Sequence, residues 1–193
     1  MWNKIAVTFV LFWCFFDHGT VGAISFEPRD FDALTTEADQ IVIGSAVAAS
    51  ARRTGPREIV TDYRFTDLEI IKGNASVETI TLTMLGGTVG AESLTVAGAP
   101  TFRRGTRYLI FIAGNGSVMF PLVGGHHGIF QIRKDGVTGV SRVHDYAGRS
   151  VTQLPGKAAE ILLNRLDDVQ VEAMSEDTFV DAIRAMIGKR HRQ

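Results

Sequence analysis

Two adjacent histidines, His126 and His127, stand in the stretch GGHHG between two apolar runs. Histidine is the commonest metal-ligating side chain, and it exchanges protons near neutral pH. Together with His144, the pair forms a candidate metal or proton-transfer site. Neighbouring side chains of a strand point to opposite faces, so the two imidazoles can share an ion only inside a turn. The glycines on both sides favour a structural turn between two strands over a metal site.

No motif for covalent or phosphate chemistry accompanies the histidines. Cys14 is the one cysteine of the sequence, which contains no H-E-x-x-H, no G-x-S-x-G and no P-loop. Asp135, Asp145 and Glu92 offer carboxylates that would complete a histidine site, but their spacing does not indicate one. We therefore expect a protein that is not an enzyme and holds no cofactor. A metal-dependent cell-envelope enzyme that uses the histidine cluster is the alternative.

Four arginines and one tyrosine are the candidates for ligand binding. Arg52, Arg53, Arg103 and Arg104 adjoin predicted strand ends. A cluster of them at one end of the fold would attract an anionic partner. Separate loop arginines in contact with water are the alternative. Tyr146 is the tyrosine whose ring we expect to remain available for a ligand such as a sugar.

Residues 1–23 have the layout of a secretory signal peptide. Lys4 gives a basic start, residues 5–16 are largely apolar, and Val21 and Ala23 occupy the −3 and −1 positions of a small-residue cleavage site. The apolar run is shorter than the roughly 20 residues that span a bilayer. Cleavage after Ala23 would leave a secreted or periplasmic chain without cysteine, and therefore without a disulfide.

The charge balance restricts the choice of partners. The 193 residues include 20 basic and 21 acidic side chains, and the net charge is −1. The predicted leader removes one charge of each sign, Lys4 and Asp17. A nearly neutral chain has no strong field to attract nucleic acid or anionic lipid. We expect the partner to be another exported protein or an envelope component, with no nucleic acid and no membrane span after cleavage.

Alternating apolar residues predict five to eight antiparallel strands, which follow a short helix over residues 30–39. The strand over residues 59–73 changes the parity of its apolar face between Phe65 and Leu68, which indicates a β-bulge near Thr66-Asp67. A strand is also expected after the turn at Gly114 to Gly116. The other expected strands cover residues 40–50, 77–85, 93–96 and 108–112. Residues 128–140 are expected to form a strand, a turn at Asp135-Gly136 and a partner strand.

From Leu154 onward the composition is helical. One helix is expected with Ala158, Ile161, Leu162 and Leu166 on a single face. In the last helix Ser175 is the expected N-cap and Gly188 the expected stop, with Phe179, Ile183 and Ile187 along one side. We therefore expect a small closed antiparallel barrel over residues 24–153, since closure removes exposed edges. A C-terminal helical extension, residues 154–193, follows it.

Three stretches resemble netrin-like domains, the class that includes the tissue inhibitors of metalloproteinases. They are ADQIVIGSAV (residues 38–47), YRFTDLEIIKG (residues 63–73) and GTRYLIFI (residues 105–112). The resemblance covers about half of the chain, residues 38–132, and implies a barrel of the oligonucleotide/oligosaccharide-binding (OB) type with a bulged second strand that ends in Lys-Gly.

The inhibitory chemistry of those inhibitors has no counterpart in this sequence. They bind the protease zinc through an N-terminal cysteine, whereas the expected mature chain has no cysteine and begins about 15 residues before the barrel. We therefore expect a binding module on an OB-like barrel. A protease-binding module with a different inhibitory segment is a further alternative, based on fold analogy alone.

Overall fold

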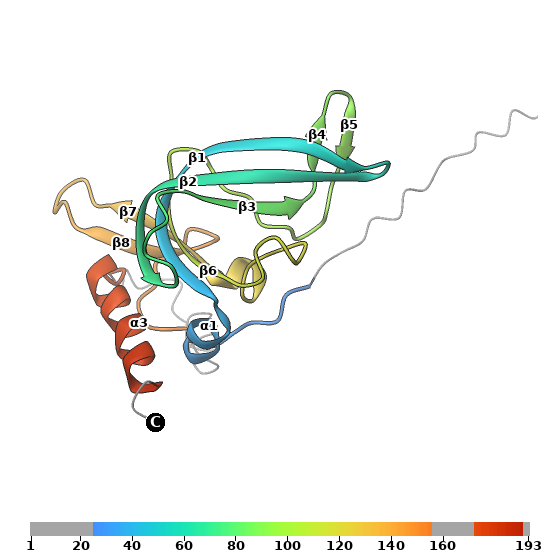
Figure 1. Cartoon of the computed structure of the whole chain (residues 1–193). Helices are drawn as coiled ribbons and strands as arrows, with labels where there is room; N and C mark the ends of the chain where they lie inside the picture. The colour runs from blue at the N-terminus through green and yellow to red at the C-terminus, as the bar shows by residue number, and fades with distance from the viewer. Residues whose placement is uncertain (1–24, 156–171, 191–193) are drawn as a thin grey trace, which may run out of the picture.

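The computed structural model describes residues 25–155 and 172–190 (Figure 1). The predicted signal peptide lies outside these residues, and so do Ala158, Ile161, Leu162 and Leu166 of the predicted first C-terminal helix. The described part is mainly β, with no helix long and apolar enough to cross a membrane. The strands are β1 (Gln40–Gly55), β2 (Glu58–Lys72), β3 (Ile80–Leu85), β4 (Gly87–Val89), β5 (Glu92–Leu94), β6 (Arg107–Ile112), β7 (Ile129–Lys134) and β8 (Ser141–Asp145). The helices are α1 (Phe31–Glu37) and α3 (Glu176–Arg190), with a 3-10 turn η1 (Gly125–Gly128).

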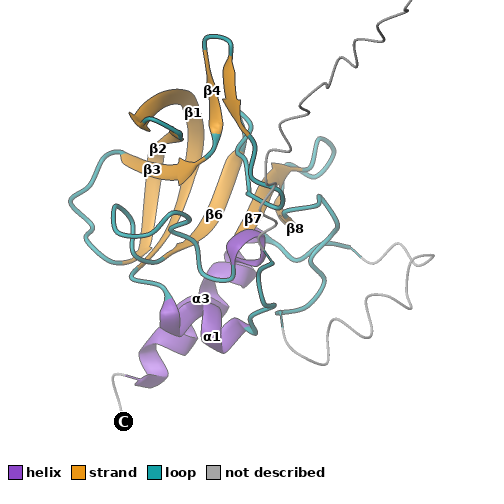
Figure 2. Cartoon of the chain, turned by 90° about the vertical axis from the view of Figure 1, so that its right-hand side faces the viewer, coloured by secondary structure: helices purple, strands orange, loops and turns teal. Residues whose placement is uncertain are grey.

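Six strands form one curled antiparallel sheet in the order β3-β2-β1-β6-β7-β8, and β4 and β5 form a separate hairpin. Figure 2 shows the hairpin projecting from the sheet on the side away from the two α-helices. The expected closed barrel is wrong, because no strand pairing joins the edge strands β3 and β8 in the described part of the chain.

A loop lies where a closing strand was expected. The amide of Asn115 donates to the Thr81 carbonyl at 2.9 Å, and the Leu85 N–H donates to the Met119 carbonyl at 3.1 Å. Residues 113–121 therefore cross the outer edge of β3. Pro121 has no N–H to donate to a ladder, which disfavours a continuous strand over these residues. We call these residues the seam loop.

A bulge in β2 bends the sheet. β2 advances by three positions from Thr66 to Glu69 while β1 advances by two, from Ser45 to Ile43. Asp67, inside the bulge, has a positive φ of 52°. The bulge predicted from the parity change is therefore confirmed.

The bulge places apolar side chains from both of its sides on the concave face. Phe65 is fully buried, and Leu68 and Ile70 pack against the same core. Leu68 lies over Gly44 of β1, where a β-carbon would come within 2.6 Å of its Cδ2 atom. Glycine at this position therefore gives Leu68 the space to turn inward.

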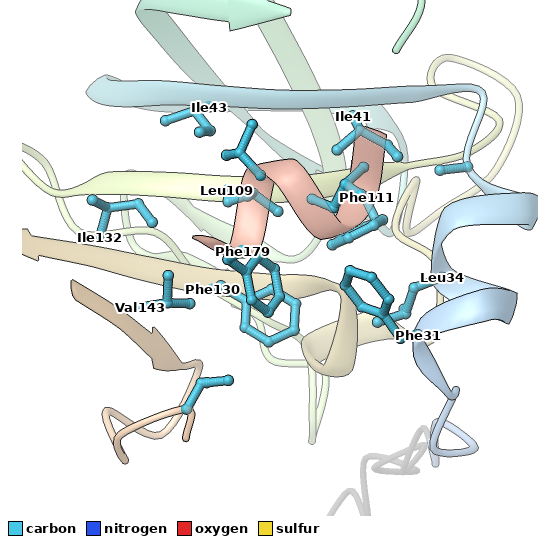
Figure 3. Packing of buried hydrophobic residues seen from close by; sticks show 14 of the residues in the cluster. Phe31, Leu34, Ile41, Ile43, Leu109, Phe111, Phe130, Ile132, Val143 and Phe179 are labelled. Carbon is cyan, nitrogen blue, oxygen red and sulfur yellow. The ribbon is translucent and has the colours of Figure 1, made fainter. Parts of the chain in front are cut away.

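The central strand β6 is buried on both faces of the sheet and contributes alternate residues to each. Tyr108, Ile110 and Ile112 enter the core on the concave face, which we call the inner core. Leu109 and Phe111 belong to the core between the sheet and the helices, which we call the helix-side core. Figure 3 shows side chains of α1, α3 and the sheet meeting in the helix-side core. The strand predicted over residues 108–112 is therefore confirmed.

Lys72 fixes α1 to the end of β2. Its Nζ atom donates to the carbonyls of Thr35 at 2.9 Å and Ala38 at 2.6 Å, at the C-terminal end of the helix. A cation there offsets the negative end of the helix dipole and satisfies free carbonyls. Asp30 caps the other end by accepting from the Ala33 N–H.

The C-terminal helix belongs to the same core as the sheet. Phe179 and Ile183 of α3 are fully buried in the helix-side core, so the helix is an integral layer of this domain. Ser175 accepts from the Thr178 N–H and is the N-cap, as predicted. The predicted stop at Gly188 is wrong: the helix continues to Arg190.

Truncation of Phe65 tests the bulge and the inner core. Phe65→Ala is expected to lower the free energy of unfolding by about 3–5 kcal/mol, because it removes a fully buried ring from a packed site. Urea denaturation provides the measurement. The neighbouring Arg64→Ala, on the exposed face, serves as the control and is expected to change stability by about 0.5 kcal/mol or less. Equal losses for the two variants would show that the face is wrongly assigned.

Candidate functional site

The two histidines lie in η1, a single 3-10 turn between the seam loop and β7. Their ring centroids are 4.1 Å apart, and both side chains are half-buried. The His126 ring also lies 6.0 Å from Phe26 and 6.1 Å from Tyr146. The histidines therefore lie in a turn, as predicted, but the turn joins a loop to β7 and does not join two strands. The rings of Phe26 and Tyr146 lie near His126.

The glycines of this turn have specific structural roles. Gly125 has a φ of +60°, and a β-carbon there would overlap the Phe26 ring. A β-carbon on Gly128 would overlap the Val123 carbonyl oxygen. The turn can form only because both positions lack side chains.

The candidate metal ligands do not form a metal site in this structure. Within residues 25–155 and 172–190, no group of three or more His, Cys, Asp and Glu side chains is placed to hold an ion. His144 lies on β8, and its Nδ1 atom is 3.3 Å from the Arg142 carbonyl. Burial lowers the pKa of His144, and the positive charge of Arg133 adds to this effect.

The structure does not bring the two arginine pairs together. Gly105 donates to the Ala46 carbonyl at 2.7 Å, which fixes Arg103 and Arg104 beside the middle of β1. Arg52 lies six positions further along β1, roughly 20 Å away at about 3.3 Å per residue.

The outer pair of arginines is engaged with acidic side chains. Arg53 forms an ion pair with Glu92, at the start of β5. The hydrogen bond from Arg52, 2.7 Å long, is the largest cause of the lowered pKa of Asp62, and Thr83 donates to the same carboxylate. All four arginines of the predicted cluster are exposed, but Arg103 and Arg104 form no ion pair with a described acidic side chain.

Tyr146 has a structural role. Its hydroxyl accepts from the Thr101 N–H at 2.9 Å, and its carbonyl accepts from the Gln131 side chain at 2.9 Å. The ring packs against the inner core. These contacts fix the segment before β6 to the end of β8, so the tyrosine predicted to be available for a ligand is half-buried.

A hollow of about 240 Å³ lies between the concave face of β2 and β3, the β4–β5 hairpin and residues 94–101. We call it the hydroxyl-lined hollow. No charged residue lines it, and its apolar lining includes Met84 and Leu94. Six of its lining residues carry hydroxyl groups: Thr61, Tyr63, Thr88, Ser93, Thr95 and Thr101.

Two buried lining residues carry hydroxyl groups, Thr61 and Tyr63; Thr61 donates to the Gly86 carbonyl, whereas the Tyr63 hydroxyl is available to a ligand. The hydroxyl makes no hydrogen bond to another described residue, although no buried side-chain oxygen among those residues lacks a partner. The oxygen is therefore not fully buried, and Tyr63 is one of the residues that line the hollow. Burial is the main cause that raises the pKa of Tyr63, with Tyr146 second, so the group is a neutral hydrogen-bond donor near pH 7.

The sequence contains a signal for this hollow in GGTVGAESLTVAGAP, residues 86–100. Gly87 has a φ of +138°, and a β-carbon there would overlap the Thr61 hydroxyl and approach Ala51. Gly86 and Gly87 therefore let the backbone cross the β1–β2 ribbon closely. A Gly-rich excursion with several hydroxyl side chains was visible in the sequence, but its return over the concave face was not.

Comparison of the chain with protein-family models, curated proteins and solved structures yields no match in any of the three.

The histidine turn can be tested with two variants. Gly128→Val is expected to lower the melting temperature strongly, because a side chain there meets the Val123 carbonyl. The double variant His126→Ala/His127→Ala is expected to lose about 1 kcal/mol or less. Thermal melts with and without a chelator provide the measurement. A parent stabilised by metal beside a chelator-insensitive double variant would contradict the structural role of the pair.

The lowered pKa of His144 predicts a pH effect on stability. The folded state binds a proton more weakly than the unfolded chain, whose histidine titrates near 6.5. Stability from this group is therefore complete above that pH and falls as the pH drops through it. Urea denaturation at pH 7.5 and 5.5 should show a smaller loss for His144→Gln than for the parent. An equal loss of stability in the parent and in His144→Gln between the two pH values would show that the His144 pKa is not lowered.

Proposed function

We propose that this chain is a non-catalytic binding module, and that its ligand is a small uncharged molecule bound in the hydroxyl-lined hollow. The observation that carries the proposal is Tyr63, which lines the hollow and whose hydroxyl has no hydrogen-bond partner among the described residues. Ligand sites combine apolar walls with a few polar groups that fix orientation. A site without charged groups favours a neutral ligand that carries hydroxyl or amide groups, because a buried charge needs a partner.

The use of polar side chains elsewhere supports a binding role over catalysis. Arg52 and Asp62 hold each other, Tyr146 and Gln131 hold loops, and Lys72 caps α1. Catalysis by proton transfer requires a titratable group within reach of a substrate. None of the residues that line the hollow is acidic, basic or histidine.

We also propose that the protein is exported, with residues 1–23 as its signal peptide. The order of basic, apolar and small residues at the N-terminus supports this location. A partner outside the cytoplasm, either another exported protein or an envelope component, follows from the same proposal. The intact mass of the chain recovered from the periplasm or medium should correspond to an N-terminus at Ile24.

The curled sheet is proposed to be a relative of the netrin-like domain with an incompletely closed barrel. The bulged β2, which ends at Lys72 and Gly73, and the small residue Gly44 in β1 support this relationship. The seam loop lies where a closed barrel has strand pairing. A binding role on the concave face agrees with the use of OB-type sheets as binding surfaces.

The three tyrosines provide a matched test of the hollow. Tyr63→Phe is expected to change stability by about 0.5 kcal/mol or less, because it breaks no hydrogen bond among the described residues. Tyr108→Phe and Tyr146→Phe each remove an acceptor for a backbone N–H, at Arg103 and Thr101. Each is expected to lose about 0.5–1.5 kcal/mol. Urea denaturation of the three variants measures these differences.

Ligand binding is tested with uncharged mono- and disaccharides and with their uronic-acid counterparts, by NMR chemical-shift perturbation. Neutral compounds should bind the parent, while Tyr63→Phe and the hollow-filling Ala99→Leu should weaken binding. Ala97→Leu is the control, since Ala97 does not line the hollow. Preferential binding of the acidic compounds, or unchanged binding by Ala99→Leu, would contradict the proposed site.

A further inference from the structure

Besides the end of β2 beyond Phe65, the curled sheet has three stretches of strand edge without a partner strand, and two of them are covered by other backbone. Along β8, Val143 donates to the Met174 carbonyl at 2.9 Å and Asp145 donates to the Arg149 carbonyl at 2.9 Å. Along β3, the seam loop accepts from the Leu85 N–H. Natural sheets cover their edges in this way because open main-chain groups attract other strands.

The third edge, the outer half of β1, is open. β6 pairs with β1 only as far as Ser45, and Ala46 exchanges two hydrogen bonds with Gly105 and Thr106. Beyond that point, no backbone hydrogen bond in the described part of the chain reaches residues 47–54 on the side away from β2. Figure 1 shows the β1–β2 ribbon extending past the rest of the sheet, with the β4–β5 hairpin beside it.

The side chains along this edge leave it accessible. Residues 48–51 are Ala-Ala-Ser-Ala, without a charge or a proline. Ala49 and Ser50 are exposed. Charged residues, prolines and bulges are the usual protection of an edge strand. Here the bulge at Val47 precedes the open stretch, and the ion pair of Arg53 with Glu92 ends it.

We propose that the open edge of β1, residues 47–52, accepts an extended peptide by antiparallel strand addition, and that acidic residues at the C-terminal end of the peptide contact Arg103 and Arg104. Unpaired N–H and C=O groups of an extended strand are best matched by another extended backbone. Antiparallel addition places the C-terminal end of the peptide at the start of the edge, beside the loop that carries both exposed arginines.

A second copy of this chain fits the edge less well than an acidic peptide. Symmetric antiparallel pairing about Ala49 and Ser50 would place Arg53 of one copy near Arg103 and Arg104 of the other. Like charges opposite each other destabilise a strand pair. The same positive groups favour a peptide with carboxylates, which also increase the association rate.

The test uses a fluorescein-labelled peptide of alternating valine and threonine that ends in three acidic residues, followed by fluorescence anisotropy at low salt. Arg103→Glu/Arg104→Glu is expected to weaken binding by about tenfold or more. Lys134→Glu/Lys189→Glu, an equal charge change at other exposed positions, is expected to weaken it by about twofold or less. Amide exchange of residues 47–52 should slow in the complex.

Two further peptides test the backbone contact. Each is methylated on alternate peptide nitrogens, one on the odd set and one on the even set. Strand addition uses only one set of N–H groups, so one peptide should bind and the other should not. Equal binding of both would overturn the proposal. It would also be overturned if a single-stranded oligonucleotide of equal charge competed equally well, or if concentration-dependent dimers protected residues 47–52 without peptide.

Discussion

The bulge in β2 is the constraint on which the rest of the structure depends. One extra residue at Asp67 turns Leu68 and Ile70 to the same face as Tyr63 and Phe65, so a single long strand keeps one buried face through a bend. The bend lets β1 pair with β2 along most of its length and with β6 along its first part. The inner core, the hydroxyl-lined hollow and the outward-projecting ribbon all follow from this geometry.

Local features were predictable because their causes lie within a few residues. The bulge was visible as a change in the parity of the apolar residues between Phe65 and Leu68. Ser175 indicated the N-cap of the last helix, and glycines on both sides of His126 and His127 indicated the turn. The open sheet was not predictable, because closure depends on whether residues 113–121 pair with β3 over several residues. The sequence there has strand composition, but Pro121 and the side-chain bond of Asn115 favour a loop.

The sites differed in how far the sequence could indicate them. The chemistry of their side chains made the histidines candidate metal ligands and the arginines candidate anion-binding groups. In the structure, His126 packs against the Phe26 ring and Arg52 forms an ion pair with Asp62. The hollow depends on residues without distinctive chemistry, and it forms only when residues 94–101 return over Tyr63. Such a site depends on long-range contacts that no short sequence window contains. The glycines that permit it, Gly86 and Gly87, were the available local sign.

The contact between β3 and the seam loop is a weak connection of this fold, where the two segments can separate locally. β3 is joined to the seam loop by a side-chain bond from Asn115 and a backbone bond from Leu85, whereas β2 pairs with β3 over six residues. Regions held by few hydrogen bonds open at a smaller free-energy cost than regions inside a ladder. Brief separation at this contact would give solvent access to the inner core while α1, α3 and the helix-side core remain packed. Natural variation in loop length is also best tolerated here, because a longer loop disturbs no strand register.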